Sequence, residues 1–338
     1  MNALSTIGMA NIVLKKGVPI THFQVQDSLG NVLLKTDFNK LSHDYGGPAV
    51  GITRANLQQI LIEHLPKHGI KWGYNCNSSH TANGRTTIKA AGMPDINADI
   101  IIGADGIRST LKKLILKVSH RRYSHQTSWR GLGPIPNTMP YFFESWGVGQ
   151  RFGAVPINAT QAYWYACINT PPNQSKYAKL TKKELIDRYR GWSSEISHLI
   201  QGTSQIIHTD IYNAYPVIQW HRNNVVLLGD AIHPTTPNLG QGAGMAIESS
   251  IVLANSISKA PDIYTAFQQF QFKRQQQTQW VTQQSWRFGK LAQLNHSWAC
   301  RIRNMAMLMT PNRLAMWVQH RQLHQLFGYS VVNSPYTS

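Results

Sequence analysis

"NNVVLLGDAIHPTTPNLGQGAGMAIESS", residues 223–250, carries most of the information about the fold. VVLLGD (225–230) is a short apolar run that ends at an acid, which predicts a buried β-strand. Two prolines stiffen the next turn, and MAIESSIVLAN (245–255) has the pattern of a helix. We therefore expect a strand–turn–helix unit that places Asp230 at the carboxyl edge of a sheet, where open α/β sheets bind ligands.

The clustered glycines of this segment predict a site for a flat ligand. Gly240, Gly242 and Gly244 leave the backbone bare where the helix begins. The opening amides of a helix lack internal partners and carry partial positive charge, so they suit a planar group that becomes anionic. A dinucleotide fingerprint is excluded here, because its third glycine would fall on Met245. The alternative is that the glycines only make a tight strand-to-helix connection.

Composition limits the class of protein. The 338 residues, 42% of them hydrophobic, are enough for two domains or one large interleaved domain. No run reaches the roughly eighteen apolar residues of a spanning helix, and the first residues lack the pattern of a secretory signal. We therefore expect a cytoplasmic protein. The three cysteines are far apart and predict neither a disulfide framework nor a metal site.

The charge is strongly basic, with 33 Lys and Arg against 15 Asp and Glu and a net charge of +18. Such a balance occurs in proteins that bind nucleic acid, anionic membranes or phosphorylated ligands. The basic residues are spread along the whole chain, and no nucleic-acid-binding motif accompanies them. Nucleic acid is therefore an unfavoured partner, and a basic surface without a dedicated partner is the plainer explanation.

Local signals predict further elements on both sides of this segment. Residues 20–38 alternate and turn at 27–31, which predicts a β-hairpin. Thr53 is placed to cap a helix, and ADIIIGADGIRSTLKKLI (98–115) predicts a buried strand followed by a helix from about Ser109. The aromatic-rich stretch 123–168 predicts a curved antiparallel sheet.

Two more signals cover the second half of the chain. Thr181 and Glu184 have the spacing of a capping box, which predicts a helix through Tyr189. From about Asp262 the sequence is Gln-rich with apolar residues at helical intervals, which predicts helix broken at Pro311.

These motifs point to a family. GDAIHPTTPNLGQGAGMAIESS (229–250) closely resembles the GD motif of single-component FAD-dependent aromatic hydroxylases, which share the p-hydroxybenzoate hydroxylase fold. DIIIGADGIRST (99–110) resembles their DG motif, and GITRANLQQIL (51–61) resembles their Arg-x-x-Leu helix. WGVGQRFGAVPINATQAYWYA (146–166) is similar to the substrate-sheet strands of the urate hydroxylase and zeaxanthin epoxidase branch. The resemblance covers nearly the whole chain in order.

The resemblance implies roles for particular residues in binding FAD. Asp230 would bind the ribityl chain of the flavin. Arg54 and Gln58 would contact FAD from the helix after Thr53, and Asp105 would act near the ribose-pyrophosphate and in NAD(P)H handling. The residues that would line the isoalloxazine ring are Gly240, Gln241, Gly242, Ala243, Gly244 and Met245.

The resemblance also implies a substrate pocket. In the urate branch an Arg and a Tyr twelve positions apart touch the substrate, and Arg151 and Tyr163 match that spacing. Pro237 is a third pocket candidate. The alternative for Tyr163 is an aromatic ring packed in a sheet. No side-chain nucleophile is required, so His233 is interpreted as a turn residue rather than a base.

The implied fold is α/β, with a Rossmann-like FAD-binding domain interleaved with an antiparallel-sheet substrate domain. The FAD-binding domain would contain residues 1–19, 50–120 and 210–260. The substrate domain would contain 20–49 and 121–209, and C-terminal helices would occupy 261–338. Relatives open with a βαβ unit that carries GxGxxG, whereas this sequence begins with a stretch that resembles the part after that unit. We therefore expect an N-terminally truncated FAD domain, from a misplaced start or as a true fragment.

The implied activity is that of a flavoprotein monooxygenase. NAD(P)H would reduce the flavin, and dioxygen would form a C4a-hydroperoxide. One oxygen atom would then hydroxylate or epoxidise an aromatic or conjugated, polyene-like small molecule. The protein would be a monomer or homodimer. The alternative is a truncated, non-catalytic remnant that does not retain FAD and acts as a binding protein.

Overall fold

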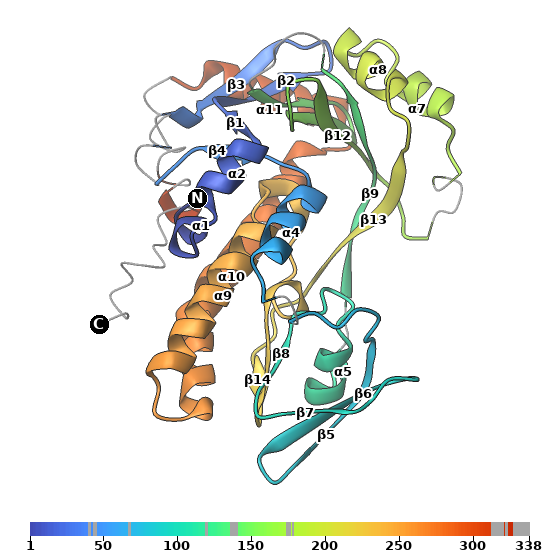
Figure 1. Cartoon of the computed structure of the whole chain (residues 1–338). Coiled ribbons are helices and arrows are strands. Elements are labelled where there is room, and N and C mark those ends of the chain that lie inside the picture. The colour runs from blue at the N-terminus through green and yellow to red at the C-terminus, as the bar shows by residue number, and fades with distance from the viewer. Residues whose placement is uncertain are drawn as a thin grey trace. The chain divides into compact units, whose positions relative to one another are not determined.

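The structure is a computed structural model of the chain, shown in Figure 1. It describes the sequence except for short gaps and most of the C-terminal end. The residues outside the description are 40–41, 43–45, 67–68, 119–120, 136–140, 174–176, 178, 312–320, 322–323 and 327–338. Among the described residues, no helix has both the length and the apolar character needed to cross a membrane.

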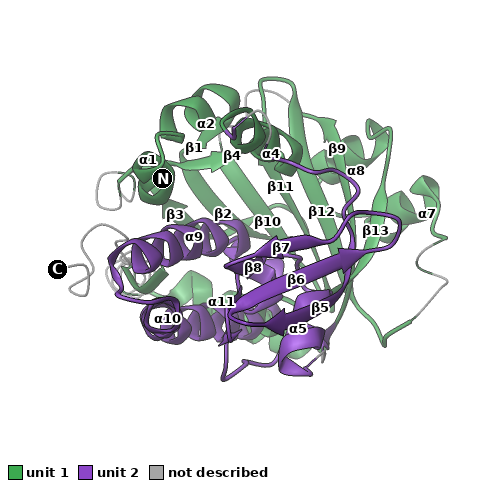
Figure 2. Cartoon of the chain, turned by 60° about the horizontal axis from the view of Figure 1, so that its bottom comes forward, with its two compact units in different colours: residues 1–64, 125–211, 290–330 green, residues 65–124, 212–289, 331–338 purple. Residues whose placement is uncertain are grey.

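The chain divides into two compact units, coloured separately in Figure 2. Unit 1 contains the described parts of 1–64, 125–211 and 290–330. Unit 2 contains the described parts of 65–124 and 212–289. Both units are assembled from segments far apart in the sequence, as the expectation of interleaved domains requires.

Unit 1 is built on a seven-stranded sheet. Its strand order is β13-β9-β12-β11-β10-β2-β3. The pairs β9–β12, β12–β11, β11–β10 and β2–β3 are antiparallel, whereas β10 and β2 run parallel. The strands are β2 (His22–Asp27), β3 (Val32–Asp37), β9 (Arg121–Pro134), β10 (Tyr141–Trp146), β11 (Gln150–Pro156), β12 (Gln161–Asn169) and β13 (Ile207–Ala214).

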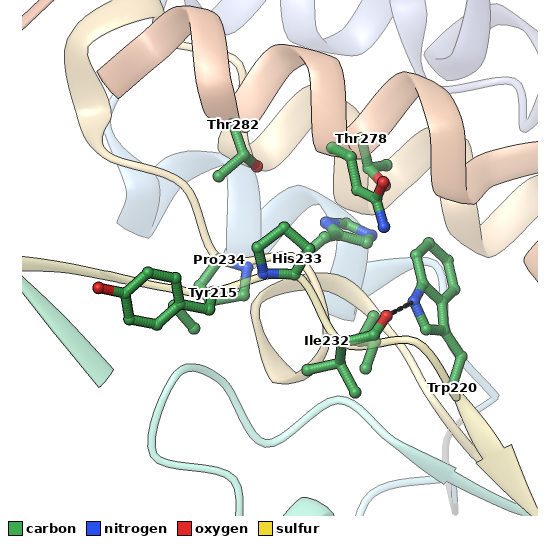
Figure 3. A pocket seen from close by; sticks show the side chains of 11 residues that line it. Tyr215, Trp220, Ile232, His233, Pro234, Thr278 and Thr282 are labelled. Carbon is green, nitrogen blue, oxygen red and sulfur yellow. Dashed lines mark hydrogen bonds between the residues drawn. The ribbon is translucent and has the colours of Figure 1, made fainter. Parts of the chain in front are cut away.

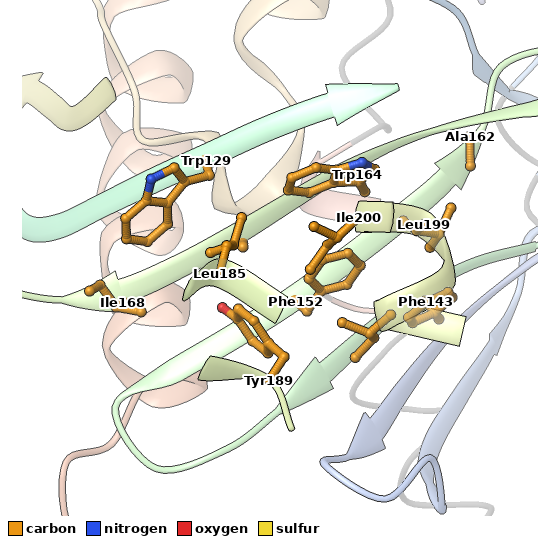
Figure 4. Packing of buried hydrophobic residues seen from close by; sticks show 13 residues of the cluster. Trp129, Phe143, Phe152, Ala162, Trp164, Ile168, Leu185, Tyr189, Leu199 and Ile200 are labelled. Carbon is orange, nitrogen blue, oxygen red and sulfur yellow. The ribbon is translucent and has the colours of Figure 1, made fainter. Parts of the chain in front are cut away.

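Two short helices cover one face of this sheet and close the core. They are α7 (Lys182–Arg188) and α8 (Ser194–Gln201). Figure 4 shows Leu185 of α7 and Leu199 of α8 over the rings of Phe152 and Trp164, which stack at 5.5 Å between centroids. Successive strand residues alternate between faces, so the even-numbered residues of β11 face these helices and the odd-numbered ones face away.

Among its described residues, unit 1 also contains one small sheet and four further helices. Strand β1 (Val18–Ile20) pairs antiparallel with β4 (Ala49–Gly51), and helix α11 lies against β3. The helices are α1 (Asn2–Thr6), α2 (Ala10–Lys16), α4 (Arg54–Glu63) and α11 (Ser297–Met309).

Unit 2 contains two three-stranded sheets and a pair of long helices. Strands β14 (His221–Arg222), β15 (Val225–Leu227) and β8 (Ile101–Gly103) form one sheet in that order. Strands β5 (Cys76–Ala82), β6 (Arg85–Ala90) and β7 (Ile96–Ala98) form the other. The helices are α5 (Thr110–Leu116), α9 (Gly242–Lys259) and α10 (Ile263–Ala292), of which the last runs on into unit 1.

Several local predictions are confirmed. The hairpin turn is held by Asp27, whose Oδ1 accepts from the amides of Leu29 and Asn31 at 2.9 Å each. Thr53 caps α4 by accepting from the Asn56 amide at 3.1 Å, and Ser109 caps α5. The predicted capping box of α7, Thr181 with Glu184, has both of its reciprocal bonds.

Two predictions of local structure need correction. The expected C-terminal helix is interrupted before Pro311, because Gly149 and Asn169 bind the carbonyls of Leu294 and Gln293 between α10 and α11, each at 2.7 Å. The strand expected over 225–230 ends at Leu227, and a 3₁₀ turn comes next. The strands within residues 123–168 pair antiparallel, as expected, and β10 also pairs parallel with β2 from the N-terminal hairpin.

The compact units group the N-terminal segments with the sheet. Helices α2 and α4 pack on each other and β1 pairs with β4, so residues 1–19 and 50–64 belong to unit 1. The functional domains expected from the sequence cut the chain differently and stay a prediction. Of the C-terminal helices expected over 261–338, most residues beyond 311 lie outside the described part.

Candidate functional site

Two parallel strands of unit 2 end side by side. Strand β15 pairs with β8 in the register Val225 with Ile101 and Leu227 with Gly103. The amide of Leu228 continues the ladder by donating to the Gly103 carbonyl at 2.9 Å. Asp105 and Asp230 come directly after these two strand ends, and both are exposed. The fold thus brings both predicted acids to the carboxyl edge of one sheet.

Asp105 has a structural task at this edge. Its Oδ2 accepts from the amides of Thr110 and Leu111, at 2.7 and 3.1 Å, at the start of α5. An acid in this position satisfies amides that lack intrahelical partners and complements the helix dipole. The sequence motif therefore encodes a helix cap, and contact with a ligand at Asp105 stays a prediction.

The glycine segment after β15 ends in an open helix start. Gly240 has φ +64°, a left-handed conformation that turns the chain into α9. No side chain caps α9, so the amides of Gly242, Ala243 and Gly244 lack a helical partner. Side-chain atoms stand 3.6 Å or more from where a Cβ would project at Gly242 or Gly244. This leaves room for a flat group against the amides.

The other predicted residues of the segment differ in exposure. Pro237 and Ala243 are exposed, and Gln241 is half-buried. Met245 is only 2% exposed, so its side chain belongs to the core rather than to the open surface. The segment is fixed from behind by α10, because Ser285 bonds the Thr236 hydroxyl at 2.8 Å and accepts from Asn238 through its carbonyl at 2.7 Å.

His233 sits in a buried polar network beneath this segment. Its Nε2 lies 3.1 Å from the Ser249 hydroxyl, which accepts from Nε of Arg274 at 3.2 Å. Arg274, fully buried on α10, also pairs with Glu248 at 2.9 Å. Burial, together with the charge of Arg274, lowers the pKa of His233 to about 3. His233 is therefore a neutral, structural side chain near neutral pH.

A small cavity adjoins His233 (Figure 3). Its volume is about 20 Å³, enough for one water molecule. Two buried atoms on its lining, His233 Nδ1 and Thr282 Oγ1, have no partner among the described residues. Because a buried water needs polar partners, the cavity suits a water that bridges α10 and the turn, rather than a substrate.

Unit 1 carries the other predicted residues. Arg54 and Gln58 lie one helical turn apart on α4, and both are exposed. Arg151 on β11 and Tyr163 on β12 are both odd-numbered, and the register places them on the sheet face opposite α7 and α8. The twelve-residue spacing therefore corresponds to two side chains on one face.

Arg151 is buried in an ion pair that the sequence did not predict. Its Nη1 lies 3.4 Å from Oε1 of Glu144, and both side chains are at most 2% exposed. Glu144 also accepts from Trp146 Nε1 at 2.8 Å and from the Tyr165 hydroxyl. A Cβ on Gly153 would come within 2.4 Å of the Tyr165 ring, so glycine there lets that ring cross β11.

The charges of this cluster stabilise one another. Burial is the largest single influence on Arg151 and lowers its pKa, but the Glu144 carboxylate, Cys167 and Tyr165 together outweigh burial and raise the pKa of the guanidinium. Burial and the same carboxylate raise the pKa of Tyr165 well above its usual value. Tyr163 is half-buried, and burial raises the pKa of its phenol. Both tyrosines are thus neutral hydrogen-bond donors at neutral pH.

Comparison with known proteins identifies the family of this chain. The FAD binding domain family matches residues 1–261. Aurachin C monooxygenase/isomerase of Stigmatella aurantiaca is 33% identical over 313 residues, 91% of this chain and 82% of that protein. The 2-heptyl-3-hydroxy-4(1H)-quinolone synthase of Pseudomonas aeruginosa is 29% identical over 337 residues, 96% of this chain and 84% of that protein.

Solved structures of similar fold include proteins that bind FAD. The structure of Klebsiella pneumoniae HpxO complexed with FAD and uric acid has a TM-score of 0.87 and covers 99% of this chain and 86% of that one, at 20% identity. This likeness shows that the chain has the fold of that protein. The chain belongs to the FAD binding domain family, whose matched members are FAD-dependent monooxygenases, and FAD is its cofactor.

Sequence reasoning missed Glu144, Tyr165 and Arg274. Glu144 and Tyr165 share the two-residue alternation of Arg151 and Tyr163, and that signal was present in YFFESW and AYWYA. Arg274 lies in a Gln-rich helix, and only the packing of α10 on α9 reveals its partner.

We predict that His233 makes the protein sensitive to mild acid. The His233 side chain has the ordinary pKa of 6.5 in the unfolded chain and a pKa of about 3 in the folded protein. As the pH falls below 6.5, His233 therefore gains a proton only in the unfolded chain. The contribution of neutral His233 to the free energy of unfolding is fully present above pH 6.5, and it decreases by about 1.4 kcal/mol per pH unit below that value. Urea unfolding of the wild type and His233→Asn at pH 7 and 5 measures this. Parallel pH profiles would contradict it.

We also predict that Glu144→Gln is strongly destabilising, by about 3–5 kcal/mol, because it leaves the buried Arg151 without its counter-charge. Asp187→Asn is the matched control, since it breaks the exposed pair with Arg190 and should change stability by less than about 1 kcal/mol. Urea unfolding at neutral pH compares the two variants. If both variants lowered the free energy of unfolding equally, the burial of the Glu144–Arg151 pair would not explain the destabilisation.

Proposed function

We propose that this protein is an FAD-dependent monooxygenase that consumes NAD(P)H and hydroxylates or epoxidises an aromatic or conjugated small molecule. The observation that carries the proposal is the uncapped start of α9 beside Asp230, in a chain of this family. The names of three relatives support this reaction class, since they are a monooxygenase/isomerase, an epoxidase and a hydroxylase.

The residues of unit 2 suit a flavin. The bare amides of Gly242 and Gly244 offer partial positive charge and a flat approach. Asp230 is exposed at the strand edge, where it can accept hydrogen bonds from ribityl hydroxyls. When bound, FAD would take a hydride equivalent from NAD(P)H and activate dioxygen to transfer one oxygen atom.

The protein residues orient and stabilise rather than react. The amides at the start of α9 would stabilise negative charge on the reduced ring, and because they are fixed by Ser285 they need not reorganise. Neutral His233 and the pair Arg274–Glu248 hold that helix start from behind. No described residue of this unit needs to act as a nucleophile in this scheme.

We propose that the sheet face carrying Tyr163 receives the substrate. Tyr163 is half-buried, so its phenol can donate to a polar group on a ring. Arg151 is 1% exposed, and we assign it a positioning task, which is to hold Glu144 and through it Tyr165. The quinolone named for the Pseudomonas aeruginosa relative carries a heptyl chain, which supports a ring with an apolar chain as the substrate class.

Gly244→Val tests the flavin site. Only a Gln241 atom at 3.9 Å stands near the added side chain, so the fold should be kept while the flat ligand is displaced. We expect the FAD dissociation constant to rise at least tenfold, a loss of about 1.4 kcal/mol or more. Ser250→Val on the exposed side of the same helix is the control. Titration of FAD by flavin fluorescence measures both, and equal affinities would contradict the assignment.

A second experiment tests the reaction. Purified protein loaded with FAD should oxidise NADH or NADPH faster when 2-heptyl-4(1H)-quinolone is added, with oxygen uptake and an added hydroxyl in the product. Mass spectrometry of the product is the measurement. A colourless preparation that neither binds FAD nor oxidises either nucleotide would favour the non-catalytic binding protein instead.

A further inference from the structure

Helix α11 of unit 1 presents an apolar stripe to solvent. Trp298, Ile302, Met305 and Met309 succeed one another at spacings of four, three and four residues, so they lie on one face of the helix. Their exposed fractions are 64, 60, 57 and 75%. Four large apolar side chains on one solvent face of a short helix mark a contact surface.

The opposite face of α11 fixes this orientation. Arg303 is 6% exposed, donates to the carbonyls of Leu291 and Ala292 at 3.1 and 3.0 Å, and lies 4.9 Å over the Trp146 ring. Cys300 is buried on the same side. The helix is thus anchored through one face, and the stripe is held outward.

An apolar groove runs along the stripe. Its volume is about 430 Å³. Its lining includes Leu291, Leu294, Trp298, Ile302, Ala306 and Met307. The groove and the stripe form one continuous apolar surface, which we call the α11 surface.

The C-terminal part of the sequence, which includes α11, carries charge of one sign. Asp262 is the last acidic residue of the sequence, and residues 263–338 contain eight Lys and Arg and no Asp or Glu. Arg301 is exposed next to Ile302 on α11, and Lys290 is exposed at the end of α10. An apolar stripe with Trp, beside exposed cations such as Arg301, is the pattern of helices that lie in the surface of an anionic membrane.

We propose that the α11 surface binds the protein to an anionic lipid surface. With thirteen residues, α11 is about 20 Å long, too short to span a bilayer and suited to lie in its plane. Trp298 and Ile302 enter the boundary between headgroups and acyl chains, and Arg301 and Lys290 meet lipid phosphates. The exposed cations Arg301 and Lys290, in a chain with a net charge of +18, favour an anionic lipid surface as the occupant. This surface would let the enzyme take an apolar substrate from lipid.

Vesicle cosedimentation of the full chain tests the proposal. Vesicles of phosphatidylcholine alone are compared with vesicles that also contain phosphatidylglycerol. The wild type should sediment with the anionic vesicles, and added salt should weaken binding. The double variant Trp298→Ser/Ile302→Ser should bind at least about tenfold more weakly, and Arg301→Glu severalfold more weakly. Ile218→Ser, at an 86% exposed site of unit 2, is the control and should bind like the wild type.

Two outcomes would overturn the proposal. One is equal sedimentation with both vesicle types that the α11 variants do not change. The other is self-association, measured by analytical ultracentrifugation without lipid, that the double variant abolishes, because a second copy would then cover the surface. Thermal melts confirm that each variant is folded, and Arg301→Glu tests the charge without altering the apolar stripe. The assay contains neither FAD nor NAD(P)H, so its result is independent of the proposed reaction.

Discussion

The proposed flavin site depends on the open N-terminus of α9. Helix starts normally find a side-chain cap or water for their first amides, and here no side chain does so. Gly240 turns the chain to the helix, and Gly242 and Gly244 keep its approach bare. Those amides therefore remain available for a ligand, and a flavin ring that becomes anionic on reduction is the group they match best.

An exposed helix start of this kind must be held rigidly. Arg274 joins α10 to α9 through Glu248 and Ser249, and Ser249 continues the chain of contacts to His233. The buried ion pair alone is weak evidence for stability, because removing two charges from water costs about as much as their attraction returns. The Arg274–Glu248 pair instead orients the site, because it fixes the turn that precedes the glycines. The Glu144–Arg151 pair in unit 1 acts similarly beneath Tyr165.

The sequence predicted those features that depend on residues close together in the chain. The caps at Thr53 and Ser109 and the strand that leads to Asp230 depend on neighbours within a few residues. Contacts between residues far apart in the sequence could not be predicted from it. The partner of Arg151 depends on the register of β10 with β11, and the end of α10 depends on a hydrogen bond from Gly149, far away in sequence. Met245 was expected at the ligand, yet its side chain turns into the core.

The central claim is that the first amides of α9 are the resting place of the flavin ring. The most direct test is a nuclear magnetic resonance titration of glycine-¹⁵N-labelled protein with FAD, monitoring the amide signals of Gly242 and Gly244. We expect these two signals to shift strongly, while the signal of Gly191, an exposed turn glycine of unit 1, stays in place. Unmoved signals from Gly242 and Gly244 under saturating FAD would contradict it.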